Sequence, residues 1–315
     1  MTPWARLSPP ARGHVAMLVF SALVAGAFSL GAMMANLISP TAFSALRFLL
    51  AAAILGSALV VSAGSLTRRA LVAPWRYLVL GGLLAAYFVL MFEGLKTAAP
   101  VSAAAVFTLT PLMSAGFGWL LLGQRMTRRI AVALGLGAMG AVWVIFRADL
   151  SALMRFQIGR GEAIYLVGCA SHALYTPMVK KLNRGESPAV FSFGVLLAGL
   201  VILTLLGLRD IRATDWAALP LIVWVTLVYT ALFSTAVSFV LLQYAALRLP
   251  SSKVMAYTYL TPSWVALWEV ALGKPVPPVL TLVGVAGIVL ALVLLLKDQE
   301  GPSPSSRSSS RSSAS

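Results

Sequence analysis

The polar side chains with the clearest chemical potential in this sequence lie inside strongly apolar stretches. His172 stands near the middle of the apolar run 161–182, and Tyr165 and Tyr175 share its face of a helix. A polar ring at that depth is costly in lipid, so it faces a cavity or bonds the backbone of a neighbouring helix. Because His14 is the only other histidine, we expect neither a metal site nor a cofactor.

A second group of polar rings lies near the end of the chain. Tyr257, Thr261, Trp264 and Trp268 follow one another at i, i+4, i+7 and i+11, which places them on one helical face. Trp268 is close to the end of its apolar run and fits an interfacial belt. Tyr257 and Trp264 straddle the middle, and they either pack in the core or line a cavity for an amphipathic solute.

Three charged residues fall in or beside apolar runs. Arg47, seven residues after Pro40, draws substrate carboxylates, closes a gate, or snorkels toward the outer interface. Glu93 and Lys96, at i and i+3, form either an external latch or an ordinary surface ion pair, worth well under about 1 kcal/mol.

The composition identifies the solvent around these residues. Of 315 residues, 60% are hydrophobic and 10% are charged, whereas soluble domains are roughly 45–50% apolar and 25% charged. The chain is therefore a polytopic, all-α membrane protein. A helix needs about 20 residues to cross the hydrocarbon core. The expected spans are ten: 15–36, 41–62, 75–95, 98–122, 127–146, 161–182, 188–208, 217–246, 251–272 and 277–297.

Similar segments recur along the chain at an offset that stays close to 150 residues. Thr110-Pro111 returns as Thr261-Pro262, and the run ending at Gly123 returns in the run ending at Gly273. The chain is therefore two copies of one unit of five spans. Since five is odd, the second copy enters the membrane upside down, which predicts inverted repeats, an architecture typical of carriers.

Pro111 and Pro262 fall in the middle of matched spans, where each ring removes a backbone donor. Such a break is tolerated in lipid when protein or a water-filled cavity satisfies the freed carbonyl. The alternative is a packing kink without a ligand. We expect a cavity enclosed by the first, third, fourth, sixth, eighth and ninth spans. The candidate lining residues are Tyr87, Thr110, His172, Tyr175, Tyr257 and Trp264, with Ser29 and Gln243 as weaker candidates.

The net charge of +15 reflects orientation. With a cytoplasmic N-terminus, sixteen Lys and Arg fall on the cytoplasmic side and seven on the other, which argues for cytoplasmic termini and against nucleic acid. We expect a monomer whose partners are lipids and a small solute. The expected division is a cytoplasmic segment (1–13), the first repeat (14–147), a connecting loop (148–160), the second repeat (161–297) and a disordered cytoplasmic tail (298–315).

The ten-span pattern, Ser-Pro-Thr-Ala-Phe-Ser-Ala-Leu-Arg-Phe-Leu-Leu from Ser39, and Thr110-Pro111 before the run ending at Gly123 resemble the drug/metabolite transporter superfamily. The resemblance covers about residues 14–297 as two EamA-type repeats. Within the superfamily the chain looks most like the YddG-type exporters, bacterial inner-membrane carriers for aromatic and other neutral amino acids. Arg47 matches the family's second-span arginine. Gln124 departs from the glutamate that many members carry after that glycine, so no role of that glutamate carries over.

The remaining patterns bear on the energy source. Gly135, Gly137 and Gly140 match a dinucleotide-binding motif in letters only; no strand precedes them, so they indicate helix packing. None of the nine acidic residues is expected at the midplane. Glu93 and Glu269 are placed at span ends, and Asp149, Glu162, Glu186, Asp210, Asp215, Asp298 and Glu300 in loops or the tail. We therefore expect facilitative export by alternating access. The alternatives are a drug or nucleobase efflux carrier, proton-coupled or not, and an intramembrane enzyme, for which no catalytic set is visible.

Overall fold

The computed structural model describes residues 8–61, 72–124, 127–146, 149–154, 158–276 and 278–296, and these form only helices and short connections. The first repeat contains α1 (Pro9–Met34), α2 (Pro40–Val61), α3 (Trp75–Leu95), α4 (Pro100–Phe107), α5 (Thr110–Leu122) and α6 (Arg128–Ile145), and the short α7 (Leu150–Met154) follows it. The second contains α8 (Arg160–Leu182), α9 (Pro188–Ala213), α10 (Leu221–Ala231), the π-helix η3 (Leu232–Val237), α11 (Ser238–Ala246), α12 (Ser251–Ala256), the 3-10 helix η4 (Tyr257–Leu260), α13 (Thr261–Ala271) and α14 (Val279–Leu296).

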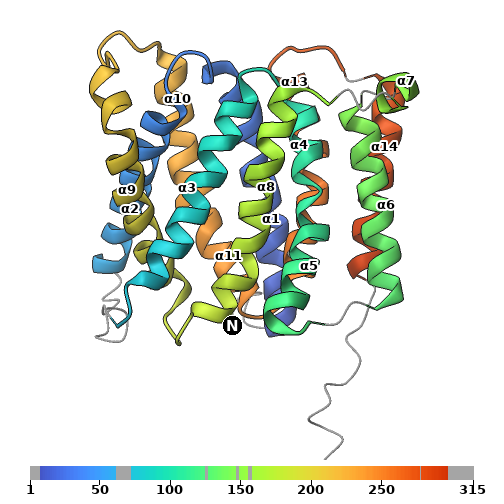
Figure 1. Cartoon of the computed structure of the whole chain (residues 1–315), viewed down its shortest axis with the longest axis horizontal. Helices are drawn as coiled ribbons and strands as arrows, with labels where there is room; N and C mark the ends of the chain where they lie inside the picture. The colour runs from blue at the N-terminus through green and yellow to red at the C-terminus, as the bar shows by residue number, and fades with distance from the viewer. Residues whose placement is uncertain are drawn as a thin grey trace, which may run out of the picture.

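The long helices lie side by side across one apolar slab (Figure 1). Within the described chain, seven helical stretches are long and apolar enough to cross a membrane: α1, α2, α3, α4–α5, α6, α9 and α10–α11. The other three crossings have visible reasons for falling short. α8 carries charged residues at both ends, the ninth span is divided among α12, η4 and α13, and α14 is a shorter apolar helix. The predicted all-helical membrane fold of ten spans is confirmed.

Proline and serine mark where these helices begin. α1, α2, α4 and α9 begin at Pro9, Pro40, Pro100 and Pro188, where proline's missing N–H costs no helical hydrogen bond. The hydroxyl of Ser187 accepts the backbone N–H of Val190 at 3.4 Å, a local N-cap.

Matched glycines mark the ends of α5 and α13. Gly123 and Gly273 both have left-handed backbone angles, with φ of 64° and 77°. The next N–H in each case reaches back five or six residues, from Gln124 to Gly118 at 3.2 Å and from Lys274 to Glu269 at 2.9 Å. These are glycine C-caps of one kind, and they repeat in the structure what the two similar sequence runs share.

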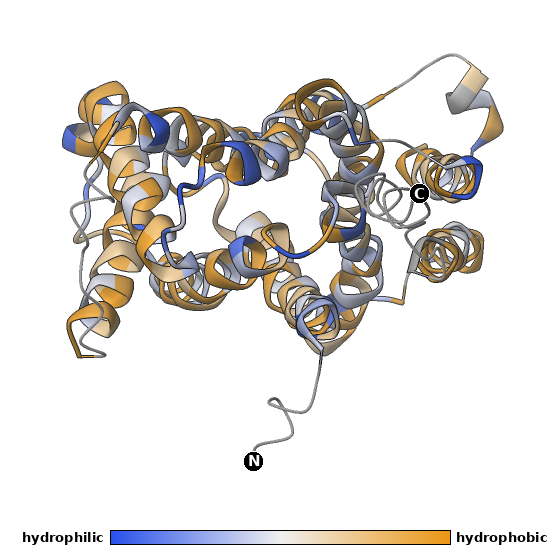
Figure 2. Cartoon of the chain, turned by 90° about the horizontal axis from the view of Figure 1, so that it is seen from below, coloured by the Kyte–Doolittle hydropathy of each residue, from blue (hydrophilic) through white to orange (hydrophobic). Residues whose placement is uncertain are grey.

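The two repeats pack through corresponding helices. α2 lies against α9 at one end of the slab and α6 against α14 at the other, while α3 packs on α8 and α1 on α10 and α11 (Figure 1). α1 and α8 run in opposite directions, as the odd number of crossings requires. Figure 2 shows apolar residues along the outer faces of both rows of helices. The core therefore lies between the two repeats.

Glycines allow the closest contacts between the repeats. A Cβ on Gly161 of α8 would collide with the Gly94 carbonyl of α3, and a Cβ on Gly140 of α6 would lie 2.8 Å from the Gly284 carbonyl of α14. A Cβ on Gly137 would overlap the ring of Tyr259. Two of the three glycines in the dinucleotide-like motif therefore serve helix packing.

The fourth and ninth spans are interrupted at matched positions. Residues 108–109 separate α4 from α5, and η4 separates α12 from α13. Pro111 and Pro262 are each the second residue of the helix that resumes. The Thr110 hydroxyl donates to the Phe107 carbonyl at 2.7 Å and so replaces the donor that Pro111 lacks.

Some expected boundaries were wrong. α1 begins at Pro9 instead of residue 15, and α9 continues to Ala213 instead of 208. Asp210 and Glu162, expected in loops, lie in the last turn of α9 and the first turn of α8. The expected tail at 298–315 and several basic residues used for orientation lie outside the described residues.

Candidate functional site

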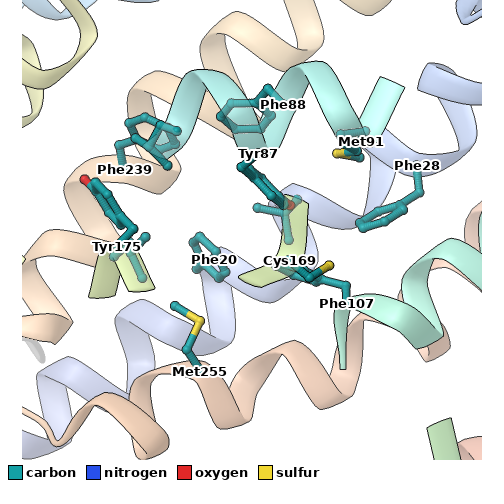
Figure 3. Close-up of a cluster of buried hydrophobic side chains, with 14 of the residues drawn as sticks. Phe20, Phe28, Tyr87, Phe88, Met91, Phe107, Cys169, Tyr175, Phe239 and Met255 are labelled. Atoms are coloured by element: carbon teal, nitrogen blue, oxygen red, sulfur yellow. The ribbon is translucent and has the colours of Figure 1, made fainter. Parts of the chain in front are cut away.

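A small cavity lies between the repeats, among α1, α2, α3, α8 and the η3–α11 segment. Its free volume is about 10 Å³, close to the space that one water molecule needs. Six of its twelve lining residues carry aromatic rings, and Figure 3 shows Phe20, Phe28, Tyr87, Phe88 and Phe239 among them. The complete lining is Phe20, Val24, Ala27, Phe28, Arg47, Tyr87, Phe88, Met91, His172, Ser234, Ser238 and Phe239.

Arg47 of α2 is the charged residue of this lining, and it is fully buried. The snorkelling alternative for Arg47 is therefore wrong, because the side chain turns into the bundle. Its Nε donates to the Thr235 hydroxyl at 2.6 Å and its Nη2 to the Ser234 carbonyl at 3.1 Å. The guanidinium also lies 3.9 Å from the centroid of the Phe88 ring, a cation–π contact. These partners come from both repeats and outweigh the attraction of the interface.

The π-helix η3 explains why a carbonyl is free for this arginine. In a regular α-helix the N–H of Ser238 would bond the carbonyl of Ser234. In η3 the wider turn directs the Ser238 N–H to Phe233 instead. The Ser234 carbonyl then accepts from Arg47, and the Ser234 hydroxyl donates to the Leu23 carbonyl of α1 at 2.9 Å.

His172 lies at the middle of α8 and is buried among aromatic rings. The Tyr87 ring stacks on it with centroids 4.4 Å apart, and the Tyr175 ring lies nearly parallel to it at 6.2 Å. Neither ring nitrogen of His172 has a hydrogen-bond partner within the described chain. The expected alternative, a histidine bonded to the backbone of a neighbouring helix, is therefore not what the structure shows.

Four other predicted residues are buried, and one of them, Tyr87, lines the cavity. The Gln243 amide donates to the Tyr175 hydroxyl at 3.1 Å, which joins α11 to α8. Ser29 of α1 is buried, and its hydroxyl has no partner in the part of the chain that is described. The hydroxyl of Tyr87 lies 3.1 Å from that of Tyr165, so Tyr87 links the cavity wall to a further buried tyrosine.

The remaining predicted residues lie where the ninth span meets α1 and the fourth span. The Tyr257 hydroxyl is 3.1 Å from Nδ1 of His14, and the Trp264 indole donates to the Ser21 hydroxyl at 3.3 Å. The Thr110 hydroxyl lies 3.2 Å from a threonine hydroxyl in η4. In this structure the fourth and ninth spans do not contribute to the cavity lining, and α2, which we did not include, does.

Sequence reasoning also missed part of the cavity wall. Phe20 and Phe28 lie in α1, whose residues are apolar on every side, so no periodicity marks the inward face. The hydroxyl side chains of the eighth span did carry a periodic signal in the sequence. Thr226, Thr230, Ser234 and Ser238 recur every four residues, and all are buried.

Polar contacts between the repeats close both ends of the bundle. On the face that carries the N-terminus, Nη2 of Arg76 lies 2.8 Å from the Glu186 carboxylate, and the Gln124 side chain accepts the Ser251 N–H at 3.3 Å. On the opposite face the Ser39 hydroxyl donates to Asp210 at 2.7 Å and the Ser102 hydroxyl to Glu162 at 2.8 Å.

Glu93 and Lys96 pair at 2.7 Å at the end of α3. The pair lies within one helix end and is partly exposed, so it joins no two elements. The Asn36 amide, which donates to the Lys96 carbonyl at 3.2 Å, connects this end to the α1–α2 loop.

Fold and site together define a multi-pass membrane protein in which two helical repeats enclose a small central site, an architecture typical of carriers. The family model for EamA-like transporters matches residues 11–146 and 159–297, one match per repeat. The chain therefore belongs to the EamA-like transporter family, and it is a membrane transporter, not an enzyme.

The chain is also similar to two further proteins over most of its length. The uncharacterized transporter YyaM of Bacillus subtilis (strain 168) is 23% identical over 281 residues, which cover 89% of this chain and 92% of YyaM. A solved crystal structure matches 90% of this chain and 95% of its own, with a TM-score of 0.67 and 21% identity. At that identity the likeness shows the fold alone.

Proposed function

We propose that the protein exports aromatic and other neutral amino acids by facilitative alternating access. The observation that carries this proposal is the central cavity, in which rings from both repeats surround a small number of polar groups. Large flat apolar surfaces with a few polar contacts suit a zwitterion with an aromatic side chain. The position between inverted repeats is where carriers hold their substrate.

The cavity is closed in this structure. Its volume of about 10 Å³ is far below the roughly 300 Å³ or more of a typical ligand pocket. Substrate entry therefore requires the repeats to separate at one face while the contacts at the other face stay closed. The Arg76–Glu186 and Ser39–Asp210 contacts lie on opposite faces, so each is suited to hold one end closed.

The lining favours a carrier without proton coupling. Proton-coupled carriers place an aspartate or glutamate near the membrane centre, and the cavity lining contains neither. Export then follows the solute gradient, driven by accumulation in the cytoplasm. His172 is the central residue to test. Uptake into proteoliposomes should be insensitive to an imposed pH gradient, and a gradient dependence that disappears in His172→Ala would overturn the facilitative mechanism.

The basic residues favour cytoplasmic termini in a bacterial inner membrane. Among described residues outside the cavity, nine lie toward the N-terminal face and five toward the other. The nine are Arg12, Arg76, Arg128, Arg129, Lys180, Lys181, Arg184, Arg248 and Lys253, and the five are Lys96, Arg160, Arg209, Arg212 and Lys274. Alkaline phosphatase fused after residue 296 should be inactive in intact cells; an active fusion would reverse this orientation.

Uptake of radiolabelled amino acids into liposomes that contain the purified protein tests the function directly. Liposomes preloaded with unlabelled phenylalanine should accumulate labelled phenylalanine by exchange, faster than protein-free liposomes. Methyl viologen, a drug-like dication, should not compete. Competition by methyl viologen without any amino acid exchange would replace the amino acid proposal with the drug efflux alternative.

A further inference from the structure

Three polar groups that line the cavity lack partners. Nη1 of Arg47, both ring nitrogens of His172 and the hydroxyl of Ser238 are buried, and none has a hydrogen-bond partner among the residues that the structure describes. They come from α2, α8 and α11, which belong to different repeats. Buried polar groups are nearly always bonded, so three of them around one space indicate a ligand group.

The charge of this cluster indicates which ligand group fits. Arg47 is permanently cationic, and its described contacts are a hydroxyl, a carbonyl and aromatic rings, none of which carries negative charge. The lining contains no aspartate or glutamate to neutralise it. A carboxylate accepts hydrogen bonds from a guanidinium, an imidazole N–H and a hydroxyl, and it supplies the missing negative charge.

We propose that Arg47, His172 and Ser238 form a carboxylate subsite, and that the carboxylate is the feature by which this transporter selects its substrates. The inference rests on the proposed function, which supplies amino acids as the carboxylates carried. It also extends beyond it, because the cluster offers donors to a carboxylate and no anionic partner to an ammonium group. An organic acid that lacks the amino group should therefore bind, and the corresponding amine should not.

Three compounds that share one aromatic body test this selectivity. 3-Phenylpropionate has the carboxylate alone, phenethylamine has the ammonium alone, and phenylalanine has both. Binding is measured by calorimetry on the purified protein in detergent, and competition is measured against phenylalanine exchange in liposomes. We expect 3-phenylpropionate to bind at least tenfold more tightly than phenethylamine. Equal binding of the two compounds would overturn the subsite.

Variants assign the selectivity to the cluster. Arg47→Gln should weaken 3-phenylpropionate at least tenfold and leave phenethylamine unchanged, whereas Arg47→Lys, which keeps the charge, should recover part of the loss. Arg76→Gln is the matched control, because Arg76 is the other fully buried arginine among the described residues and lies outside the cavity lining. It should leave the ratio of the two affinities unchanged. An unchanged ratio in Arg47→Gln would refute the assignment.

A second pair of variants keeps the test decisive if Arg47→Gln fails to fold. His172→Phe retains the ring stacking and removes both nitrogens, and Ser238→Ala removes one hydroxyl. Each should weaken 3-phenylpropionate at least threefold. Thr230→Val is the control for Ser238→Ala, because the Thr230 hydroxyl bonds only carbonyls of its own helix. Unchanged affinity in both cavity variants would refute the subsite.

The same measurements separate this inference from the proposed function. If 3-phenylpropionate binds in an Arg47-dependent manner and no amino acid is exchanged, the subsite stands and amino acid export falls. If amino acids are exchanged and Arg47→Gln binds 3-phenylpropionate and phenylalanine as tightly as the wild type does, the export proposal stands and the subsite is refuted.

Discussion

The ion pair between Arg76 and Glu186 allows a stability prediction with a magnitude. It joins α3 of the first repeat to the α8–α9 connection of the second, with side chains 0% and 1% exposed. Arg76 also donates to the Leu182 carbonyl at 2.6 Å and to the Val72 carbonyl at 2.9 Å. The Glu186 carboxylate in turn accepts the Arg184 N–H at 2.7 Å. The pair therefore ties the loop between α8 and α9 to the start of α3.

Glu186→Gln removes the charge and keeps the shape. A charge-assisted hydrogen bond contributes about 1.5–3 kcal/mol, and loss of one partner from a fully buried ion pair costs about 3–5 kcal/mol. A glutamine at position 186 can still accept a hydrogen bond from Arg76, so we expect a loss of about 2 kcal/mol, in the range of one charge-assisted bond. At roughly 2 °C per kcal/mol for a chain of this size, the apparent melting temperature should fall by about 4 °C.

The assay is thermal unfolding in one detergent at a fixed scan rate, because a large membrane protein unfolds irreversibly and its midpoint depends on that rate. Arg76→Met should lower the midpoint further, since it leaves the carboxylate without its cation and removes the donor from three backbone carbonyls, those of Val72, Ala73 and Leu182. In the double variant Arg76→Met, Glu186→Gln, the loss should be smaller than the sum of the two single losses. Additive losses, or a shift below 1 °C in Glu186→Gln, would refute the reasoning.

Three further predictions concern other contacts. Burial opposes ionisation of Glu186, but bonds from Arg76 and the Arg184 N–H hold its pKa below the ordinary value. The stabilisation is therefore complete above about pH 5 and is lost as the pH falls through the folded pKa, so the difference in melting temperature between the wild type and Glu186→Gln should shrink as the pH is lowered below about 5. Gly161→Ala should lower stability by about 1–3 kcal/mol, because the added methyl collides with α3, whereas Gly135→Ala, with open space around it, should not. Thr110→Val should cost about 1 kcal/mol in the same melts by removing the donor to the carbonyl freed at Pro111, and no cost would show that another group satisfies that carbonyl.

The fold was accessible from the sequence because membrane helices are determined locally. Each span must satisfy its own backbone in lipid, so apolar length alone identifies it. The duplication around Thr110-Pro111 and Thr261-Pro262 predicted two repeats. The odd number of spans in each repeat predicted that they have opposite orientations in the membrane. Boundaries such as the start of α1 at Pro9 were less certain, since polar and apolar residues both continue a helix beyond the hydrocarbon core.

The site was harder to predict from the sequence, because contacts between distant segments decide which side chains face the cavity. His172 and Tyr87 were predicted since a polar group in the middle of a span is costly wherever it points. Arg47 satisfies the snorkelling geometry equally well by sequence, and only Ser234 and Thr235, nearly 190 positions away, decide its direction. The π-turn that frees the Ser234 carbonyl has no sequence signature comparable to a proline.

The two repeats share one arrangement of helices but contribute different polar groups to the cavity. The position that corresponds to Arg47 in the second repeat, by the offset of 148 that relates Ser39-Pro40 to Ser187-Pro188, is the buried Val195. Likewise η3 interrupts the eighth span, whereas its counterpart α3 is one continuous α-helix. The cation therefore belongs to one repeat and its hydrogen-bond acceptors belong to the other.

This division couples binding to the motion that transport requires. In this closed structure, Thr235 and the Ser234 carbonyl hold the guanidinium of Arg47 in the same cavity lining as His172 and Ser238. The cavity has room for about one water molecule, so the subsite admits a carboxylate only after the repeats have moved apart. A subsite assembled from two moving bodies thus changes its affinity as they move, and we expect the tightest binding in the arrangement that admits the carboxylate and still leaves all three groups within reach of it.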